Sequence, residues 1–387
     1  MLELLWLLLP VAAASGWFAA RRSRARAPAR TAGLSSDYFK GLNYLLNEQP
    51  DKAIEVFVRM VEVDGETVET HLALGNLFRR RGEVDRAIRI HQNLIARPTL
   101  SREQRTQALL ELGEDYMKAG LFDRAENLFL ELIELNAHTE RALRHLLDIY
   151  QQEQDWEQAI AMARRLQELT GTRMHDVIAQ YYCEMADRAL KERDTSQAQQ
   201  HIKRALSFDR DCVRASMLQG ELELQHGDCK AAVRAYRRVV DQDIEYISEI
   251  IAPLRRCYLD MGNRPAFMAF LREIVQRCDA ISPMLALVAE VRDQEGEDRA
   301  GDLMVEHLRR RPSVRGLNWL IEQNLAHSTG EARDDMRILH DLTTQLLQDK
   351  AVYACHQCGF TGKQLHWQCP SCKSWNTIKP IQGVVGE

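Results

Sequence analysis

The chain has 387 residues, more than a single hydrophobic core usually holds, so two or more structural units are expected. A formal net charge of −5, with 28% charged residues, gives no overall electrostatic attraction to nucleic acid. Glycine and proline are too few for long disordered stretches, and helix formers such as Ala, Leu, Arg and Glu dominate, so we predict an all-α fold.

The first segment, residues 1–20, is apolar apart from Glu3. At about 1.5 Å per residue, residues 2–20 would form a helix of roughly 28 Å, enough to cross the hydrocarbon of a bilayer. Five arginines follow between residues 21 and 30, whereas a cleaved signal peptide would carry its positive charge before the apolar segment. We therefore predict one uncleaved transmembrane anchor, then a basic juxtamembrane linker over residues 21–36. The positive-inside rule leaves the rest of the chain in the cytoplasm.

A repeat of about 34 residues occupies residues 37–310. In eight copies a marker residue, Ala in six of them, recurs at intervals of 34 to 39 residues, near the start of the second of two predicted helices. Several copies also have a small residue twelve positions before the marker and a larger one four positions after it. The markers are Ala53, Ala87, Ala125, Ala159, Ala198, Ala232, Phe267 and Gly301; the preceding small residues are Gly41, Gly75, Gly113, Ala186 and Gly220; the following residues include Phe57, His91, Phe129, Ala163, Ile202 and Tyr236.

This pattern resembles the tetratricopeptide repeat, in which small residues let the two helices of a hairpin pack closely. The resemblance implies a right-handed superhelical solenoid, because each hairpin can bury its apolar side only against its neighbours. The copies depart from the repeat at Leu147, Phe267 and Gly301, and the two longer intervals predict longer connections near residues 98–102 and 170–175. A solenoid of this kind offers an extended concave surface to a protein or peptide partner.

Further helices are predicted after the repeats. Apolar residues recur at helical spacing in two groups, one in residues 317–325 and one in residues 338–346. Residues 311–350 are therefore expected to end the solenoid.

The most specific motif lies in residues 351–381, where two Cys-x-x-Cys pairs are separated by ten residues. The pairs are Cys355 with Cys358 and Cys369 with Cys372. Each pair predicts a tight turn whose backbone N–H groups point at the sulfurs, and four thiolates suit one tetrahedral metal ion with no open position. Such a site is structural rather than catalytic. A thioredoxin-like redox pair is the alternative, but it explains only one of the two motifs.

The two cysteine pairs resemble the knuckles of rubredoxin, which binds iron. Lys373 stands where rubredoxins usually have glycine, however, and the ten-residue interval is closer to that of a zinc ribbon. Sulfur ligands suit both metals, so iron and zinc both stay open. About thirty residues bury little apolar surface, so folding of the module is expected to depend on the metal. Four apolar residues are expected to shield the module or to contact the solenoid: Phe360, Trp367, Trp375 and Ile378.

The other five cysteines are scattered singly through predicted helical sequence. Their odd number and their isolation argue against a disulfide framework and indicate a reducing compartment. They are Cys183, Cys212, Cys229, Cys257 and Cys278.

An apolar anchor, tetratricopeptide hairpins and a C-terminal rubredoxin-type module form an unusual combination. Residues 353–360, 366–372 and 375–381 are similar to the tail of the lipopolysaccharide assembly protein B family. The resemblance implies a single-pass protein of the bacterial inner membrane, with most of the chain on the cytoplasmic side. It implies a non-enzymatic adaptor that promotes degradation of the lipid A deacetylase LpxC by the membrane protease FtsH, and that gathers lipopolysaccharide-synthesis proteins. It also implies one metal ion per chain on the four paired cysteines, with iron favoured over zinc.

Other function classes fit the sequence less well. A membrane-tethered, rubredoxin-like electron carrier would use the knuckle but would not need the long solenoid, whereas a generic tetratricopeptide assembly scaffold stays open as an alternative. A nucleic-acid-binding zinc ribbon predicts clustered basic residues, but only Lys363, Lys373 and Lys379 lie near the knuckles, so no nucleic-acid partner is expected. The common hydrolase, metalloprotease and phosphate-loop motifs are missing from the sequence, so no catalytic residue and no enzyme activity are predicted. A homo-oligomer stays open.

Overall fold

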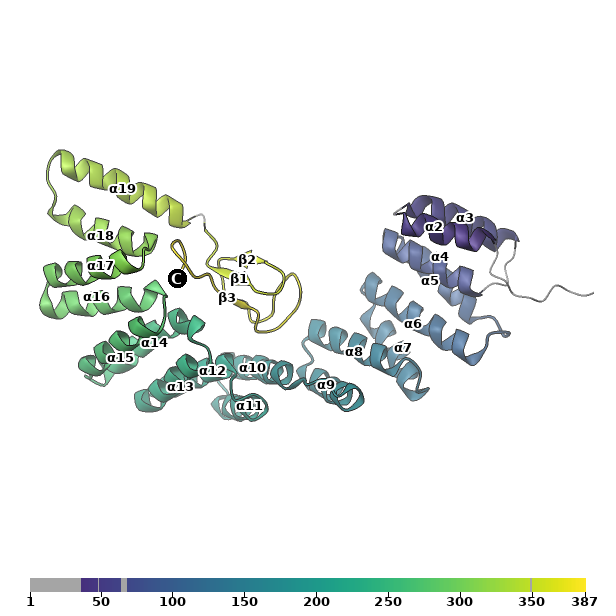
Figure 1. Ribbon diagram of the computed structural model, residues 1–387. Helices are drawn as coiled ribbons and strands as arrows, with labels where there is room; N and C mark the ends of the chain where they lie inside the picture. Colours follow the sequence, from purple (N-terminus) through teal and green to yellow (C-terminus); the bar gives the residue numbers. More distant parts are fainter. Residues whose placement is uncertain (1–35, 48, 64–67, 349) are drawn as a thin grey trace, which may run out of the picture. The chain divides into compact units, whose positions relative to one another are not determined.

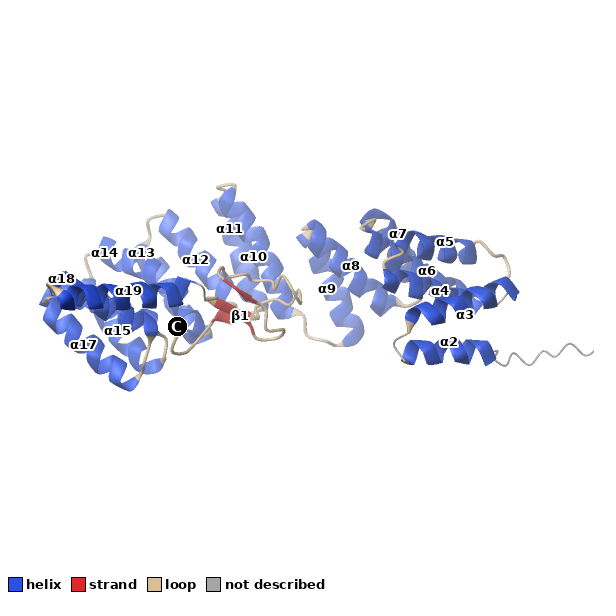
Figure 2. Ribbon diagram, turned by 90° about the horizontal axis from the view of Figure 1, so that it is seen from above, coloured by secondary structure: helices blue, strands red, loops and turns tan. Residues whose placement is uncertain are grey.

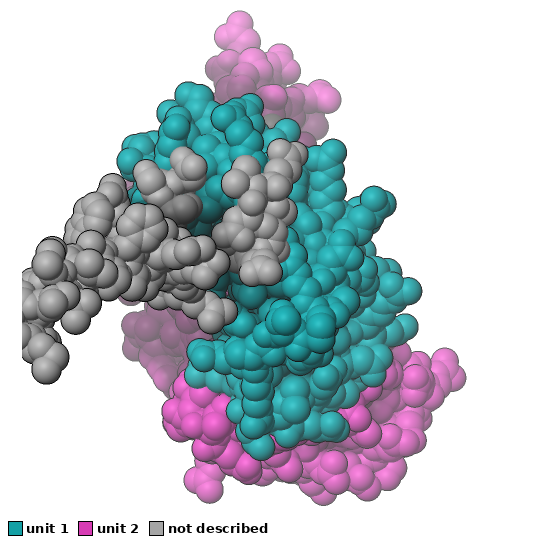
Figure 3. All heavy atoms as spheres, turned by 90° about the vertical axis from the view of Figure 1, so that its right-hand side faces the viewer, with its two compact units in different colours: residues 1–142 teal, residues 143–387 magenta. Residues whose placement is uncertain are grey.

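The computed structural model describes residues 36–47, 49–63, 68–348 and 350–387, which are mainly helical up to residue 348 (Figures 1 and 2). The chain divides into two compact units, residues 1–142 and residues 143–387, coloured separately in Figure 3. The helices are α2 (Ser36–Leu46), α3 (Pro50–Val63), α4 (Val68–Arg81), α5 (Val84–Ile95), α6 (Arg102–Ala119), α7 (Phe122–Glu134), α8 (Thr139–Glu153), α9 (Trp156–Thr170), α10 (His175–Lys191), α11 (Thr195–Phe208), α12 (Val213–Gln225), α13 (Cys229–Gln242), the 3₁₀ helix η2 (Ile244–Tyr246), α14 (Ile247–Asp260), α15 (Arg264–Arg277), α16 (Ile281–Glu295), α17 (Glu297–Arg310), α18 (Val314–His327) and α19 (Glu331–Gln348).

Successive helices pair into hairpins, each with a first (A) helix and a second (B) helix. The pairs run from α2 with α3 through to α18 with α19, so the even-numbered helices are A helices. Local sequence sets the helix ends: Ser101 and Gln104 form a reciprocal capping box at the start of α6, and Asp155 caps α9. The last hairpin, α18 with α19, lies within the segment predicted to carry the terminal helices.

Four of the five predicted small residues, all glycines, lie where a B-helix ring meets the A helix. A Cβ atom added at Gly113 would lie 2.6 Å from the ring of Phe129, and one added at Gly220 would lie 2.5 Å from the ring of Tyr236. Carbon atoms do not approach this closely in a packed core, so only glycine fits without movement of the ring. The same arrangement joins Gly41 to Phe57 and Gly75 to His91.

Two departures from the repeat have local explanations. In the fourth copy the same two positions hold Leu147 and Ala163, both buried, so the small and the large residue are exchanged. In the eighth copy the buried residue is Ala300 rather than Gly301, where an added Cβ would meet none of the described atoms within 4 Å. The predicted marker at Gly301 is therefore wrong by one residue, because Gly296 both ends α16 and begins α17 and so shortens the turn.

The longer intervals between repeats have two structural causes. α5 ends at Ile95 and α6 begins only at Arg102, while α9 ends at Thr170 and α10 begins at His175. The A helices that follow are also long, with 18 residues in α6 and 17 in α10. The additional residues of the two longer intervals therefore lengthen both the connection between repeats and the A helix that follows it.

Within the described part of the chain, no helix combines the length and the apolar character needed to cross a bilayer. The predicted anchor, residues 1–20, lies outside the described residues, as does the predicted linker up to residue 35. The anchor therefore stays a prediction.

A small antiparallel sheet forms the C-terminal module. Strand β1 (Tyr353–Cys355) lies between β2 (Thr361–Gly362) and β3 (Ile378–Pro380), with Ala354 opposite both Thr361 and Lys379. Cys355, Cys369 and Ile378 form its buried core. The all-α prediction is right for the solenoid, and the knuckle module adds three short strands.

Candidate metal centre

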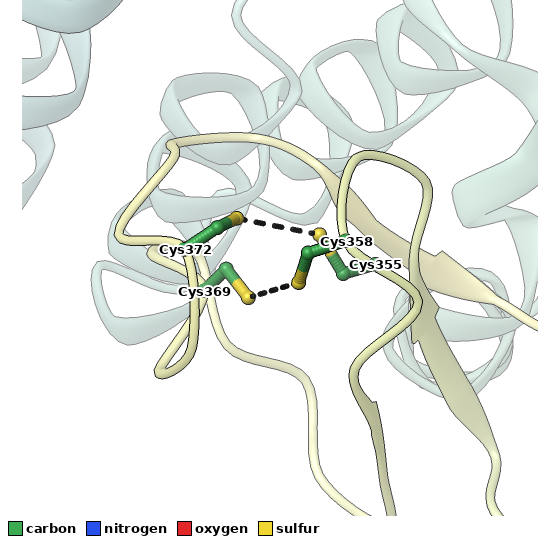
Figure 4. A group of neighbouring side chains, drawn as sticks. All are labelled: Cys355, Cys358, Cys369 and Cys372. Carbon is green, nitrogen blue, oxygen red and sulfur yellow. Dashed lines mark hydrogen bonds between the residues drawn. The ribbon is translucent and has the colours of Figure 1, made fainter. Parts of the chain in front are cut away.

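The four paired cysteines come together in the C-terminal module (Figure 4). Their Sγ atoms all lie within 4.8 Å of one another. The Sγ atoms of Cys355 and Cys372 are 3.8 Å apart, and those of Cys358 and Cys369 are 3.6 Å apart. Metal–sulfur bonds of about 2.3 Å in a tetrahedron place neighbouring sulfurs about 3.8 Å apart. The spacing therefore fits one four-coordinate ion, either iron or zinc.

Each knuckle is closed by a residue in the left-handed region of backbone conformation. Gly359 has a φ of 76° and donates its N–H to the carbonyl of Cys355 at 2.9 Å. Lys373 has a φ of 60° and donates its N–H to the carbonyl of Cys369 at 2.9 Å. Lys373 thus departs from the rubredoxin pattern in residue type but keeps the conformation that glycine adopts most easily.

Hydrogen-bond donors around the sulfurs favour thiolates at two of the four positions. A hydrogen bond between Cys355 and the Thr377 hydroxyl, and then the backbone N–H groups of the first knuckle, lower the pKa of the Cys355 thiol to about 6. The side chain and N–H of Ser374 lower the pKa of the Cys372 thiol. Burial instead raises the pKa of the Cys369 thiol to about 11. Because metal ligands must be deprotonated, a metal ion at this site would have to displace the proton of Cys369.

The module docks on the second unit, where it contacts α10, α12, η2 and α14 (Figure 1). Trp367 stacks on Tyr246 with ring centroids 5.5 Å apart, and the guanidinium of Arg214 lies over the same indole at 5.7 Å. The Tyr246 hydroxyl donates a hydrogen bond to the carbonyl of Ile378 at 2.9 Å. Tyr246 is fully buried, so this contact is part of a core shared by the solenoid and the module.

The second indole of the module, Trp375, binds a neighbouring part of the solenoid. Its ring meets Trp156 and Tyr181 edge-on, with centroid distances of 6.2 and 5.8 Å. Its Nε1–H donates to Oε1 of Gln151 at 3.0 Å, and the amide of Gln368 donates to the same oxygen at 3.2 Å. One glutamine side chain therefore orients two residues of the module.

Charged and polar contacts surround these rings. Lys379 Nζ lies 2.7 Å from Asp243 Oδ2 and 2.5 Å from Glu245 Oε2. The Tyr353 hydroxyl donates to Glu249 Oε1 at 2.8 Å. Lys379, one of the few basic residues near the knuckles, is thus used in an internal contact.

The end of the chain also binds the solenoid. The Glu387 side-chain carboxylate pairs with Arg315 of α18 and accepts the N–H of Ser282 of α16 at 3.3 Å. Val314 donates its N–H to the carbonyl of Val384 at 2.7 Å. The module is therefore held by its sheet, by its indoles and by the residues that follow it.

Part of the interface between module and solenoid was predicted from the sequence, namely the apolar residues of the module. Trp367 and Trp375 contact the solenoid, whereas Phe360 and Ile378 pack inside the module, so the two predicted roles are divided between the two pairs. The solenoid residues that receive the module were not predicted. Tyr246, Arg214 and Gln151 lie in helical sequence with no local motif, and only the fold brings them to the module.

Comparison with known proteins agrees with both parts of this architecture. Residues 353–380 match the family described as rubredoxin metal binding domain, and residues 70–105, 110–172 and 183–246 match tetratricopeptide repeat families. Over 388 aligned residues the chain is 40% identical to lipopolysaccharide assembly protein B of Escherichia coli strain K12, with 100% of each chain covered. This chain belongs to the lipopolysaccharide assembly protein B family. The resemblance predicted from its C-terminal motifs is thereby confirmed.

A second member of the lipopolysaccharide assembly protein B family is more distant. The protein of Haemophilus influenzae is 35% identical over 392 residues, with 98% of each chain covered. Among solved structures, the C-terminal part of a tetratricopeptide repeat-containing protein from Cytophaga hutchinsonii matches with 14% identity and a TM-score of 0.39, covering 69% of this chain and 98% of that one.

Proposed function

We propose that this member of the lipopolysaccharide assembly protein B family is a membrane-anchored adaptor that promotes degradation of the deacetylase LpxC by the protease FtsH. Residues 1–20 would anchor it in the inner membrane, with the linker, solenoid and module on the cytoplasmic side. The solenoid would hold the client and other lipopolysaccharide-synthesis proteins. The chain is 40% and 35% identical, over nearly its full length, to two proteins named for lipopolysaccharide assembly, which supports a role in that process. LpxC as the client and FtsH as the protease are proposed from the family resemblance.

The proposal assigns one role to each segment. The segments are 1–20 for the anchor, 21–36 for the basic linker, 37–310 for about eight repeats, 311–350 for the terminal helices and 351–381 for the metal module. Cys355, Cys358, Cys369 and Cys372 would hold one ion, iron by the family resemblance.

The observation that best supports an adaptor function is that the metal module serves as a docking element on the solenoid. A metal bound by all four sulfurs has no open position for a substrate, so its contribution is to fold the module. The folded module in turn presents Trp375 to α9 and α10, and it presents Trp367 and Lys379 to η2 and the residue before it. Shape and binding surface, rather than reaction chemistry, are what this arrangement supplies.

Co-purification tests the proposed partners. The full chain, extracted from cells in detergent, should bring down both LpxC and FtsH. A chain lacking residues 1–20 should still recover LpxC but less FtsH, because confinement to one bilayer raises the effective concentration of the two membrane proteins. Recovery of neither partner by the full chain would contradict the adaptor function.

A further inference from the structure

Two of the five cysteines outside the metal module are not isolated, contrary to the expectation from sequence. Cys183 Sγ, in α10, lies 3.8 Å from Cys212 Sγ, which directly precedes α12. Both side chains are fully buried, and both thiols are free. A contact between two thiols therefore joins the A helices of neighbouring repeats.

Three buried polar atoms without a hydrogen-bond partner among the described residues belong to residues within four positions of Cys183 or Cys212 in the sequence. Gln180 donates its amide N–H to Cys212 Sγ at 3.6 Å, but its Oε1 has no hydrogen-bond partner among the described residues. The buried Ser216 Oγ, one helical turn after Cys212, and the Tyr181 hydroxyl are likewise unpartnered within the described part of the chain. Buried polar atoms are nearly always hydrogen-bonded, so these three atoms leave hydrogen-bonding capacity unused in the two segments that carry the thiols.

The two thiols differ in acidity. The hydrogen bond from Cys183, and then the backbone N–H of Ala215 at the start of α12, lower the pKa of the Cys212 thiol. Burial raises the pKa of the Cys183 thiol well above its ordinary value. A thiol with a lowered pKa beside one with a raised pKa provides both a nucleophile and a resolving partner.

We propose that Cys183 and Cys212 form a peroxide-reactive dithiol that closes to a disulfide between α10 and α12. The Cys212 thiolate attacks one oxygen of hydrogen peroxide, so that an S–O bond forms and the O–O bond breaks; the released hydroxide takes a proton and leaves as water. The Cys183 sulfur then attacks the sulfenic sulfur, the S–S bond forms, and hydroxide leaves with the Cys183 proton as a second water. Two electrons pass from the thiols to the peroxide. The proposal does not depend on the adaptor function.

The disulfide would form next to the surface that holds the metal module. Tyr181, two residues before Cys183, contacts Trp375, and Arg214, two residues after Cys212, lies over Trp367. A disulfide has an S–S distance of about 2.05 Å, so the sulfurs must approach from their present 3.8 Å. Oxidation therefore moves at least one of two cysteines that each lie two residues from a side chain in contact with an indole.

Peptide mapping of the full-length protein tests the proposal. The reduced protein is treated with hydrogen peroxide, its remaining thiols are alkylated in denaturant, and it is digested without reductant. We expect a peptide pair joined through Cys183 and Cys212, two hydrogens lighter than the separate peptides and released by dithiothreitol. Cys212→Ala should abolish this pair, whereas Cys257→Ala, which removes another fully buried thiol, should leave it unchanged.

Single-cysteine variants identify the attacking sulfur. In Cys183→Ala, peroxide should leave a sulfenic acid on Cys212 that dimedone traps, whereas in Cys212→Ala the thiol of Cys183 should stay unlabelled. The proposal is overturned if both thiols are fully alkylated after a peroxide treatment that oxidises Cys229, a partly exposed thiol outside the metal module. It is also overturned if Cys183 and Cys212 form disulfides only with other cysteines.

Discussion

In several hairpins a glycine of the A helix lies against a ring of the B helix. A methyl group added at Gly220 would lie 2.5 Å from the ring of Tyr236, whereas one added at Gly301 would meet none of the described atoms within 4 Å. Both glycines lie inside helices, in α12 and α17. The two positions therefore separate the effect of steric fit from that of helix propensity.

Gly220→Ala should destabilise the second unit by about 1–3 kcal/mol, the usual cost of overpacking a core. Gly301→Ala should be neutral or stabilising by up to about 1 kcal/mol, because alanine favours the helix. Urea unfolding of the full-length protein, followed by circular dichroism, measures both. Equal effects of the two substitutions would contradict the close packing seen at Gly220.

The Tyr246 hydroxyl provides a second test at this scale. Tyr246→Phe keeps the ring against Trp367 but removes the hydrogen bond to the carbonyl of Ile378, which leaves a buried acceptor unpaired at a cost of about 1–3 kcal/mol. Amide hydrogen exchange in residues 353–380 should become faster, and exchange in α4 to α7 of the first unit should stay as it is. Unchanged exchange in the module would show that this bond does not hold it.

At the scale of helices and strands, the sequence predicts what is local. The hairpins follow from helical periodicity and a repeat of about 34 residues, and the cluster of four cysteines follows from two short motifs. The marker at Gly301 was misplaced by one residue, because Gly296 serves two helices at once. The docking face was missed, because Tyr246 and Ile378 are 132 residues apart in sequence. The Cys183–Cys212 contact, 29 residues apart, was missed for the same reason.

The module should fold only around its metal ion. In Cys369→Ser, loss of a ligand from the centre of the module should abolish metal binding and leave residues 351–381 sensitive to protease, while the solenoid keeps its helicity. Metal analysis, limited proteolysis and circular dichroism measure these effects. Full metal content in this variant would contradict the assignment of the site.

The absorption spectrum of the intact protein identifies the metal. Iron in the four-sulfur site should give thiolate-to-iron charge-transfer bands, whereas zinc would leave the protein colourless. A colourless protein with one zinc ion per chain would contradict the iron proposed from the family resemblance.

At the scale of the whole molecule, the proposed adaptor function requires one membrane anchor, with the rest of the chain in the cytoplasm. The apolar residues 1–20 are followed by five arginines, which the positive-inside rule places on the cytoplasmic side. A reporter fused after Glu387 should therefore be active only in the cytoplasm, and the N-terminus should remain uncleaved. Periplasmic activity, or a mature N-terminus near Ser15, would contradict this topology.

The half-life of LpxC in cells tests the adaptor function most directly. The native protein is replaced by the intact chain, by a chain lacking residues 1–20, or by Cys372→Ser, and a full deletion serves as reference. We expect rapid turnover with the intact chain only. Loss of the anchor separates client from protease, and loss of the metal unfolds the module that docks on the solenoid, so both variants should lengthen the half-life toward that of the deletion and raise lipopolysaccharide. An LpxC half-life that does not change in the full deletion would contradict the adaptor function and favour a pure assembly scaffold.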